Sequence, residues 1–165
     1  MQSLKGKNMV VVGASGGVGR RIAEAGVRSG ARVLAVAKQE GPLHELALRI
    51  PGVEVLPLDA GTEDAPSKVF DAMRPDILVV SAGAFPPVAP LHELSWQQFA
   101  GNWESDVRIA FEFCKAALLR PLPAGALVVV VASAAAVGGS PISGGYAGAK
   151  RTQMFLASYS QKESD

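Results

Sequence analysis

The chain has 165 residues, with 48% hydrophobic residues, 19% charged residues and a formal net charge of +1. This composition excludes a disordered chain, which needs low hydrophobicity and high net charge, and it leaves no basic excess to hold a nucleic-acid backbone. The single cysteine, Cys114, excludes an internal disulfide and a cysteine-based zinc site. No apolar run approaches the roughly 20 residues of a membrane span. Residues 1–7 lack the apolar stretch of a signal peptide, so we expect a soluble, cytoplasmic protein with one domain over residues 1–165.

Five short, continuous runs of aliphatic residues bounded by turn residues predict strands at Met9–Val12, Val33–Val36, Val53–Leu56, Ile77–Val80 and Leu127–Val131. Such runs are typical of strands that are covered on both faces. Amphipathic patterns predict helices at Val18–Ser29, Thr62–Met73, Ser95–Leu119 and Ser143–Gln161, with Thr62 as a cap. Because strands and helices alternate, we predict an α/β fold with a doubly wound parallel sheet. It has three layers (α/β/α) and the Rossmann-like strand order 3-2-1-4-5.

A glycine-rich loop follows the first predicted strand and opens the first helix. It reads Gly13-Ala14-Ser15-Gly16-Gly17-Val18-Gly19. Small residues here let the backbone turn tightly and approach a pyrophosphate, which then lies at the helix N-terminus. The spacing Gly-x3-Gly-x-Gly differs from the usual dinucleotide fingerprint, and an ordinary strand–helix turn is the alternative. The position at the first strand–helix junction favours coenzyme binding, for which we predict Gly13, Ser15, Gly17, Val18 and Gly19.

The end of the second strand indicates which nicotinamide coenzyme is preferred. NAD sites place an acidic residue there, whereas NADP sites place a cation. This chain has Ala37-Lys38, so we expect NADP with Lys38 near its 2′-phosphate, and NAD is less favoured; a solvated surface lysine is the alternative. Asp59, just past the third strand, is a candidate acceptor for the adenine amino group or a turn residue. The two histidines are isolated in the sequence, so no metal site is predicted.

The segment Tyr146-Ala147-Gly148-Ala149-Lys150 places a phenol and an ammonium group on one helix face. A free phenol ionises at about pH 10, and a nearby cation favours the phenolate, so Tyr146 is a candidate general acid/base. Ser133 lies at the end of the fifth predicted strand, and the carboxyl ends of parallel strands face the ligand crevice. A tyrosine–lysine pair alone is frequent by chance, and a serine there is usually a turn former. The combination carries the prediction.

With these residues in this order, the chain resembles the short-chain dehydrogenase/reductase family. The matching positions are Gly13, Gly17, Gly19, Asp59, Ser133, Tyr146 and Lys150. The resemblance implies hydride transfer between a nicotinamide ring and the carbonyl or alcohol carbon of a small substrate. It implies that Tyr146 exchanges the proton, that Ser133 hydrogen-bonds the substrate oxygen, and that Lys150 binds the ribose and tunes Tyr146. It also implies a homodimer or homotetramer formed through the long helix and the Tyr146 helix.

Several positions depart from the family pattern. The family's Asn-Asn-Ala-Gly after the fourth strand reads Val80-Ser81-Ala82-Gly83, in which Ala82 and Gly83 keep the close backbone approach to the coenzyme. The family's asparagine that holds a water of the proton relay corresponds to Asp106, with Asn102 as a less favoured substitute. A negative charge at Asp106 opposes the effect of Lys150 on Tyr146.

Members of this family continue with two more strands and a loop that covers the substrate. We expect Leu127–Val131 to be an edge strand with an unpaired apolar edge. Either further chain or a partner covers it, and further chain is the favoured expectation because this strand carries no protective charge or proline. The alternative function is a non-catalytic nucleotide-binding or interaction protein that retains the motif residues.

Overall fold

The computed structural model describes residues 3–164, so Met1 and Gln2 of the N-terminal segment and Asp165 lie outside the described residues. Its strands form one parallel sheet in the order β3-β2-β1-β4-β5. The strands are β1 (Asn8–Val12), β2 (Arg32–Ala37), β3 (Val53–Pro57), β4 (Ile77–Val80) and β5 (Leu127–Val130). The predicted fold class and strand order are confirmed, and the predicted strand ends agree within one residue.

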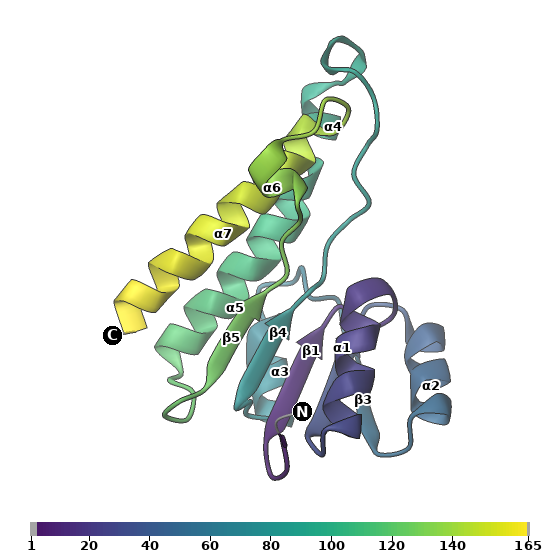
Figure 1. Cartoon of the computed structure of the whole chain (residues 1–165), viewed down its shortest axis with the longest axis vertical. Helices are drawn as coiled ribbons and strands as arrows, with labels where there is room; N and C mark the ends of the chain where they lie inside the picture. Colours follow the sequence, from purple (N-terminus) through teal and green to yellow (C-terminus); the bar gives the residue numbers. More distant parts are fainter. Residues whose placement is uncertain (1–2, 165) are drawn as a thin grey trace.

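Helices cover both faces of the sheet (Figure 1). Helices α1 (Gly17–Arg28) and α2 (Glu40–Arg49) pack on one face, where the strands contribute Val11, Val33 and Val79. Helices α3 (Ala65–Ala72) and α5 (Arg108–Leu119) pack on the other, against Val10, Leu34 and Leu78. Neighbouring residues of one strand point to opposite faces, so a continuous aliphatic run supplies both layers of the core.

The predicted helix Ser95–Leu119 is one helical segment with an irregular centre. Helix α4 (Trp96–Asn102) runs into a π-helix, η2 (Trp103–Val107), which leads into α5. Ser95 caps α4 in a capping box: its hydroxyl accepts from Gln98 N, and the Gln98 side chain accepts from Ser95 N. The wider turn of η2 changes which side chains share a helix face before and after it. Asp106 lies within η2 and is buried.

Other helices differ from the sequence prediction. Helix α3 begins at Ala65, and the Thr62 hydroxyl donates to Asp59 O instead of capping the helix, so the predicted cap is wrong. Helix α2, the short α6 (Ala135–Gly138) and the 3-10 turn η1 (Leu91–Glu93) were not predicted. Helix α7 (Gly144–Ser164) forms where it was expected and packs against α4, α5 and η2.

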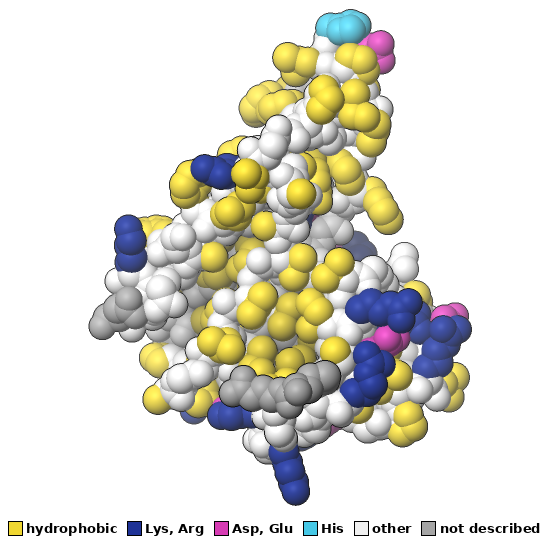
Figure 2. Space-filling view, in the orientation of Figure 1, with side chains coloured by type: hydrophobic (Ala, Val, Ile, Leu, Met, Phe, Trp, Pro, Cys, Tyr) yellow, Lys and Arg dark blue, Asp and Glu magenta, His cyan; other side chains and the backbone are white. Residues whose placement is uncertain are grey.

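Strand β5 lies at the edge of the sheet and pairs only with β4. Leu127 is 59% exposed and Val129 is 42% exposed, so the expectation that all five strands are covered on both faces is wrong for β5, whereas the expected apolar edge is present. Figure 2, in the orientation of Figure 1, shows hydrophobic side chains gathered across this part of the sheet and Lys and Arg side chains around α1. Within residues 3–164, no helix is long and apolar enough to cross a membrane.

Candidate active site

A cleft of about 800 Å³ opens at the carboxyl ends of the strands. Its wall is formed by the glycine loop, the segments that follow the five strands, η2 and the first turns of α7. The predicted residues that line it are Gly13, Ser15, Gly17, Val18, Lys38, Asp59, Ala82, Gly83, Asp106, Tyr146 and Lys150. The fold therefore brings the coenzyme candidates and the tyrosine–lysine pair to one space, as expected for the carboxyl edge of a parallel sheet.

The glycine loop is held close to the segment after β4. Gly13 has a φ of +92°, and a Cβ at this position would overlap the amide nitrogen of Ala82. Gly19 does not line the cleft, but a Cβ there would overlap the Gly13 carbonyl oxygen. Helix α1 begins after Gly16, and no side chain caps it. The amide groups of its first turn, next to Gly16 and Gly17 in the cleft wall, are therefore available to an anionic ligand.

The two candidates for the adenosine end of the coenzyme contact each other. The Lys38 Nζ lies 2.7 Å from Asp59 Oδ2, and Asp59 Oδ1 accepts from Gly61 N at 3.0 Å. The hydrogen bond from Lys38, followed by that from Gly61, lowers the pKa of the Asp59 carboxyl, and the same pair raises the pKa of Lys38. Both side chains are exposed, so the ion pair is weak and exchangeable. The sequence predicted both residues but not their contact.

The tyrosine–lysine pair lies on α7. The Lys150 Nζ is 5.5 Å from the centre of the Tyr146 ring, and Lys150 is only 7% exposed. Ser133 lies in the turn that leads into α6, where its Oγ accepts from Ala135 N at 3.3 Å. Ser133 is just beyond the cleft lining, which reaches Val131 and Ala132. The hydrogen bond of Ser133 within its turn fits the turn-former alternative, while its own hydroxyl hydrogen has no acceptor among residues 3–164.

Of the described side chains that line the cleft, Asp106 has the most hydrogen-bond and ion-pair partners. It is 1% exposed, and its Oδ2 lies 3.0 Å from Lys150 Nζ. Its Oδ1 accepts from Ala84 N at 2.9 Å, Ser105 Oγ at 2.8 Å and Asn102 Nδ2 at 3.3 Å. The sequence predicted Asp106 and weighed Asn102 as its substitute, and the structure places both side chains together.

Sequence reasoning missed Gln153, which donates from Nε2 to the main-chain oxygen of Asp106 at 2.8 Å. Gln153 is 1% exposed, and its position three residues after Lys150 puts both on one face of α7. The spacing of three residues from Lys150 was the signal in the sequence that could have identified Gln153. Within residues 3–164 no group of His, Cys, Asp and Glu side chains has an arrangement that holds a metal ion.

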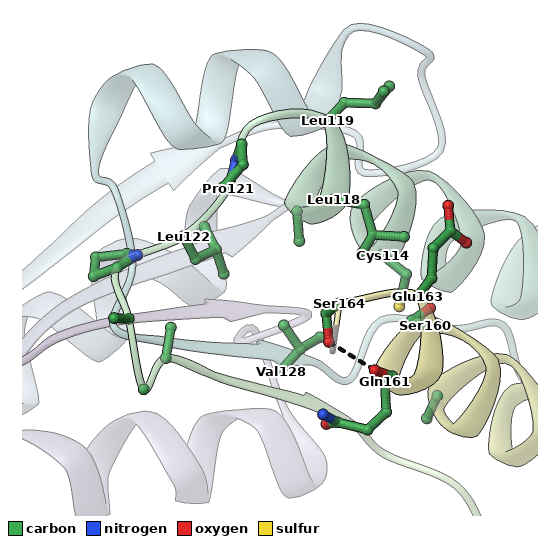
Figure 3. Close-up of a pocket in the computed structure, with 16 residues that line it drawn as sticks. Cys114, Leu118, Leu119, Pro121, Leu122, Val128, Ser160, Gln161, Glu163 and Ser164 are labelled. Atoms are coloured by element: carbon green, nitrogen blue, oxygen red, sulfur yellow. Dashed lines mark hydrogen bonds between the residues drawn. The ribbon is translucent and has the colours of Figure 1, made fainter.

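A second cavity, of about 690 Å³, lies away from the cleft, between the end of α5, the loop before β5 and the end of α7 (Figure 3). Cys114 points into this region beside Ser160, and burial raises the pKa of its thiol, with a smaller opposite effect from Ser160. Cys114 is buried, and a thiol with little thiolate is a poor nucleophile.

Comparison with known proteins gives a consistent result. The family model described as short chain dehydrogenase matches residues 7–164. L-xylulose reductase of Homo sapiens is 29% identical over 109 residues, which are 66% of this chain and 45% of that protein. D-erythrulose reductase of Gallus gallus is 29% identical over 136 residues, 80% of this chain and 55% of that protein. Carbonyl reductase [NADPH] 2 of Sus scrofa is 29% identical over 110 residues, 67% of this chain and 45% of that protein.

Among solved structures, a short-chain dehydrogenase/reductase described as glucose/ribitol dehydrogenase, from Brucella melitensis, superposes with a TM-score of 0.90 at 25% identity. The superposition covers 100% of this chain and 73% of that one. The chain spans about half the length of the curated relatives it matches.

Proposed function

Because this chain belongs to the short-chain dehydrogenase family, we propose that it is an NADP-dependent oxidoreductase. It transfers a hydride between the nicotinamide ring and the carbonyl or alcohol carbon of a small-molecule substrate. Residues 1–165 are then one coenzyme-binding domain. The observation that carries this proposal is the single cleft into which the glycine loop, Lys38 and the Tyr146–Lys150 pair all open.

The residues of the cleft fit a dinucleotide. The uncapped first turn of α1 and the small residues of the glycine loop suit the pyrophosphate, because nothing fills the space where its oxygens bind the amide groups. Lys38 suits the 2′-phosphate of NADP, and no acidic residue stands at Ala37 or Lys38 to favour NAD. The name of the porcine relative, carbonyl reductase [NADPH] 2, supports the same preference. When bound, NADP supplies or accepts the hydride.

Three side chains of this chain handle the proton and the substrate oxygen. Tyr146 gives a proton to the carbonyl oxygen during reduction and takes it back during oxidation. Lys150 has three N–H donors, of which one meets Asp106 Oδ2 at 3.0 Å and another Val131 O at 3.4 Å. The third is left for a ribose hydroxyl. The Ser133 hydroxyl accepts within its turn, which leaves its own hydrogen to donate to the substrate oxygen.

The proposed assembly is a homodimer or homotetramer through α5 and α7. The exposed apolar residues Phe111 on α5 and Met154 and Phe155 on α7 support this surface. The proposed compartment is the cytoplasm, because a single unpaired cysteine fits a reducing environment. Sedimentation of the wild type and of Phe155→Glu tests the assembly, and a monomer in both contradicts it.

Steady-state loss of NADPH with a panel of aldehydes and ketones tests the function. We expect turnover that saturates with NADPH and requires a carbonyl compound. Tight NADPH binding without turnover of any member of the panel would instead support the non-catalytic alternative, a nucleotide-binding protein that keeps the motif residues. A chain that binds neither NADPH nor NADH would contradict both.

A further inference from the structure

The Asp106 carboxylate is surrounded by donors on both of its oxygens. On one side, Oδ1 receives hydrogen bonds from Ala84 N, Ser105 Oγ and Asn102 Nδ2. On the other side, Oδ2 receives the Lys150 ammonium at 3.0 Å. An asparagine has only one acceptor oxygen, so it could serve one of these sides but would present its NH2 group to donors on the other. A carboxylate is therefore the group that these surroundings require.

The carboxylate also joins separate parts of the cleft wall. A Cβ at Gly83 would lie 2.6 Å from Asp106 Oδ2, so the missing side chain of Gly83 makes room for the carboxylate beside the backbone after β4. Asn102 Nδ2 donates to Ala84 O at 2.9 Å, and Gln153 on α7 donates to Asp106 O at 2.8 Å. These bonds tie the loop after β4, η2 and α7 together at one buried charged group.

The pair leaves Tyr146 beside two opposite charges. The charged residues that line the cleft are Lys38, Asp59, Asp106 and Lys150. Lys38 and Asp59 lie past β2 and β3 and pair with each other, so they add little net charge at α7. Arg151, also on α7, is exposed and lies over the Phe155 ring. Among the described residues that line the cleft, Asp106 is thus the carboxylate that opposes the positive charge that Lys150 brings to within 5.5 Å of the Tyr146 ring centre.

We propose that Asp106 is a positioning residue that fixes Lys150 by a direct ion pair and cancels much of its charge at Tyr146. Tyr146 is therefore exposed to less of the lysine charge than it would be beside an unpaired lysine, and the catalytic importance of this arrangement rests on the proposed function. In this chain the lysine is held by a carboxylate in direct contact, and Gln153 occupies the main-chain oxygen of the same residue.

The ionisation of Tyr146 can be observed without turnover, because the chain has 2 tyrosines and Tyr159→Phe leaves Tyr146 as the only one. The ultraviolet absorbance of tyrosinate is titrated against pH in this parent and with Asp106→Asn added. We expect Asp106→Asn to lower the midpoint by about one pH unit or more, since it leaves the lysine charge uncancelled. The matched control is Glu104→Gln, which removes an exposed carboxylate from the same π-helix and leaves the midpoint in place.

A second comparison does not require Asp106→Asn to fold with an unpaired lysine. In the same parent, Lys150→Met leaves the Asp106 charge with its other donors, and Lys150→Met with Asp106→Asn removes both charges. We expect the double variant to ionise at a lower pH than Lys150→Met alone. Equal midpoints in this comparison, or an unchanged midpoint in folded Asp106→Asn, would overturn the proposal. Because the titration needs no substrate, this result is independent of whether NADPH turnover is found.

Discussion

The Lys38 ammonium lies 2.7 Å from the Asp59 carboxylate, and this ion pair stands at the rim of the cleft where β2 and β3 end side by side. Both groups are exposed to solvent, so their attraction is screened and contributes little to stability. Lys38 can therefore leave Asp59 and bind a phosphate group at little cost in free energy. The contact joins the two residues that the sequence assigned separately to the 2′-phosphate and the adenine.

Replacing Lys38 tests coenzyme selectivity. We expect Lys38→Met to weaken NADPH binding by about tenfold or more, because a charge-assisted hydrogen bond contributes about 1.5–3 kcal/mol, and to leave NADH binding nearly unchanged. Fluorescence titration with both coenzymes measures this. The control is Lys68→Met, which breaks a similar Lys–Asp pair, with Asp64, away from the cleft. Equal losses for NADPH and NADH would show that Lys38 does not select the 2′-phosphate.

The same substitution changes the titration of Asp59. The hydrogen bond from Lys38 is the largest cause of the lowered pKa of this carboxyl, so Lys38→Met should raise the pKa toward its ordinary value of about 3.9. The hydrogen bond from Gly61 N should still hold the pKa of Asp59 partly below its ordinary value. Carboxyl-carbon NMR follows the titration directly, and an unchanged Asp59 curve would contradict the ion pair.

The sign of the linked stability effect follows from the same lowered pKa. The pKa of Asp59 is lower in the folded chain than in the unfolded chain, so its contribution to the free energy of unfolding is fully present when the pH is above the pKa of the unfolded chain. It is lost as the pH falls through the folded pKa. Wild type and Lys38→Met should therefore differ slightly in thermal unfolding near neutral pH and converge in acid. A difference that grows in acid would have the wrong sign.

Gly13 is expected to be the most sensitive glycine of the coenzyme loop. Gly13→Ala adds a Cβ that overlaps the Ala82 backbone at a positive φ, and it should lower the free energy of unfolding by about 2 kcal/mol or more. Gly16→Ala, in the same loop, is the control, because its Cβ would meet no atom within 4 Å and its φ is extended. Urea unfolding measures both, and equal losses would refute the proposed close approach.

Most of the fold could be predicted from the sequence because the strands are continuous aliphatic runs between turn residues. Helix α2 was missed because Gly41 and Pro42 stand in its first turn and read as loop residues. The π-helix was missed because Ser95–Leu119 reads as one amphipathic helix, and the widening of one turn depends on contacts made by Asn102, Asp106 and Gln153. The contact of Gln153 with Asp106 joins residues far apart in the sequence, as does that of Asn102 with Ala84.

The candidate site was predictable in its residues but not in its interactions. Motif spacing placed Tyr146, Lys150 and Asp106 near the same strand ends, since parallel strands share one carboxyl edge. It could not show that Asp106 binds Lys150 directly, because that distance depends on how η2 packs against α7. For Lys38 and Asp59 the predicted strand order already placed the second strand beside the third, but whether the two side chains meet depends on the conformation of the segments that follow these strands.

The only cysteine reports on the packing between α5 and α7. Cys114 is buried, and burial raises its thiol pKa, so the native chain should react with a soluble thiol reagent much more slowly than the chain unfolded in urea. Absorbance of the released chromophore follows the reaction at mildly alkaline pH. Equal rates in the two states would mean that this region opens readily.

The most direct test is the rate of NADPH oxidation with a carbonyl substrate in wild type and Tyr146→Phe. A general acid contributes about a hundredfold or more, so we predict that turnover falls by at least that factor while NADPH still binds with near wild-type affinity. Tyr159→Phe removes the other tyrosine, which is exposed on α7, and should keep the wild-type rate. If Tyr146→Phe turns over substrate as fast as the wild type, Tyr146 is not the acid and the proposed mechanism is contradicted.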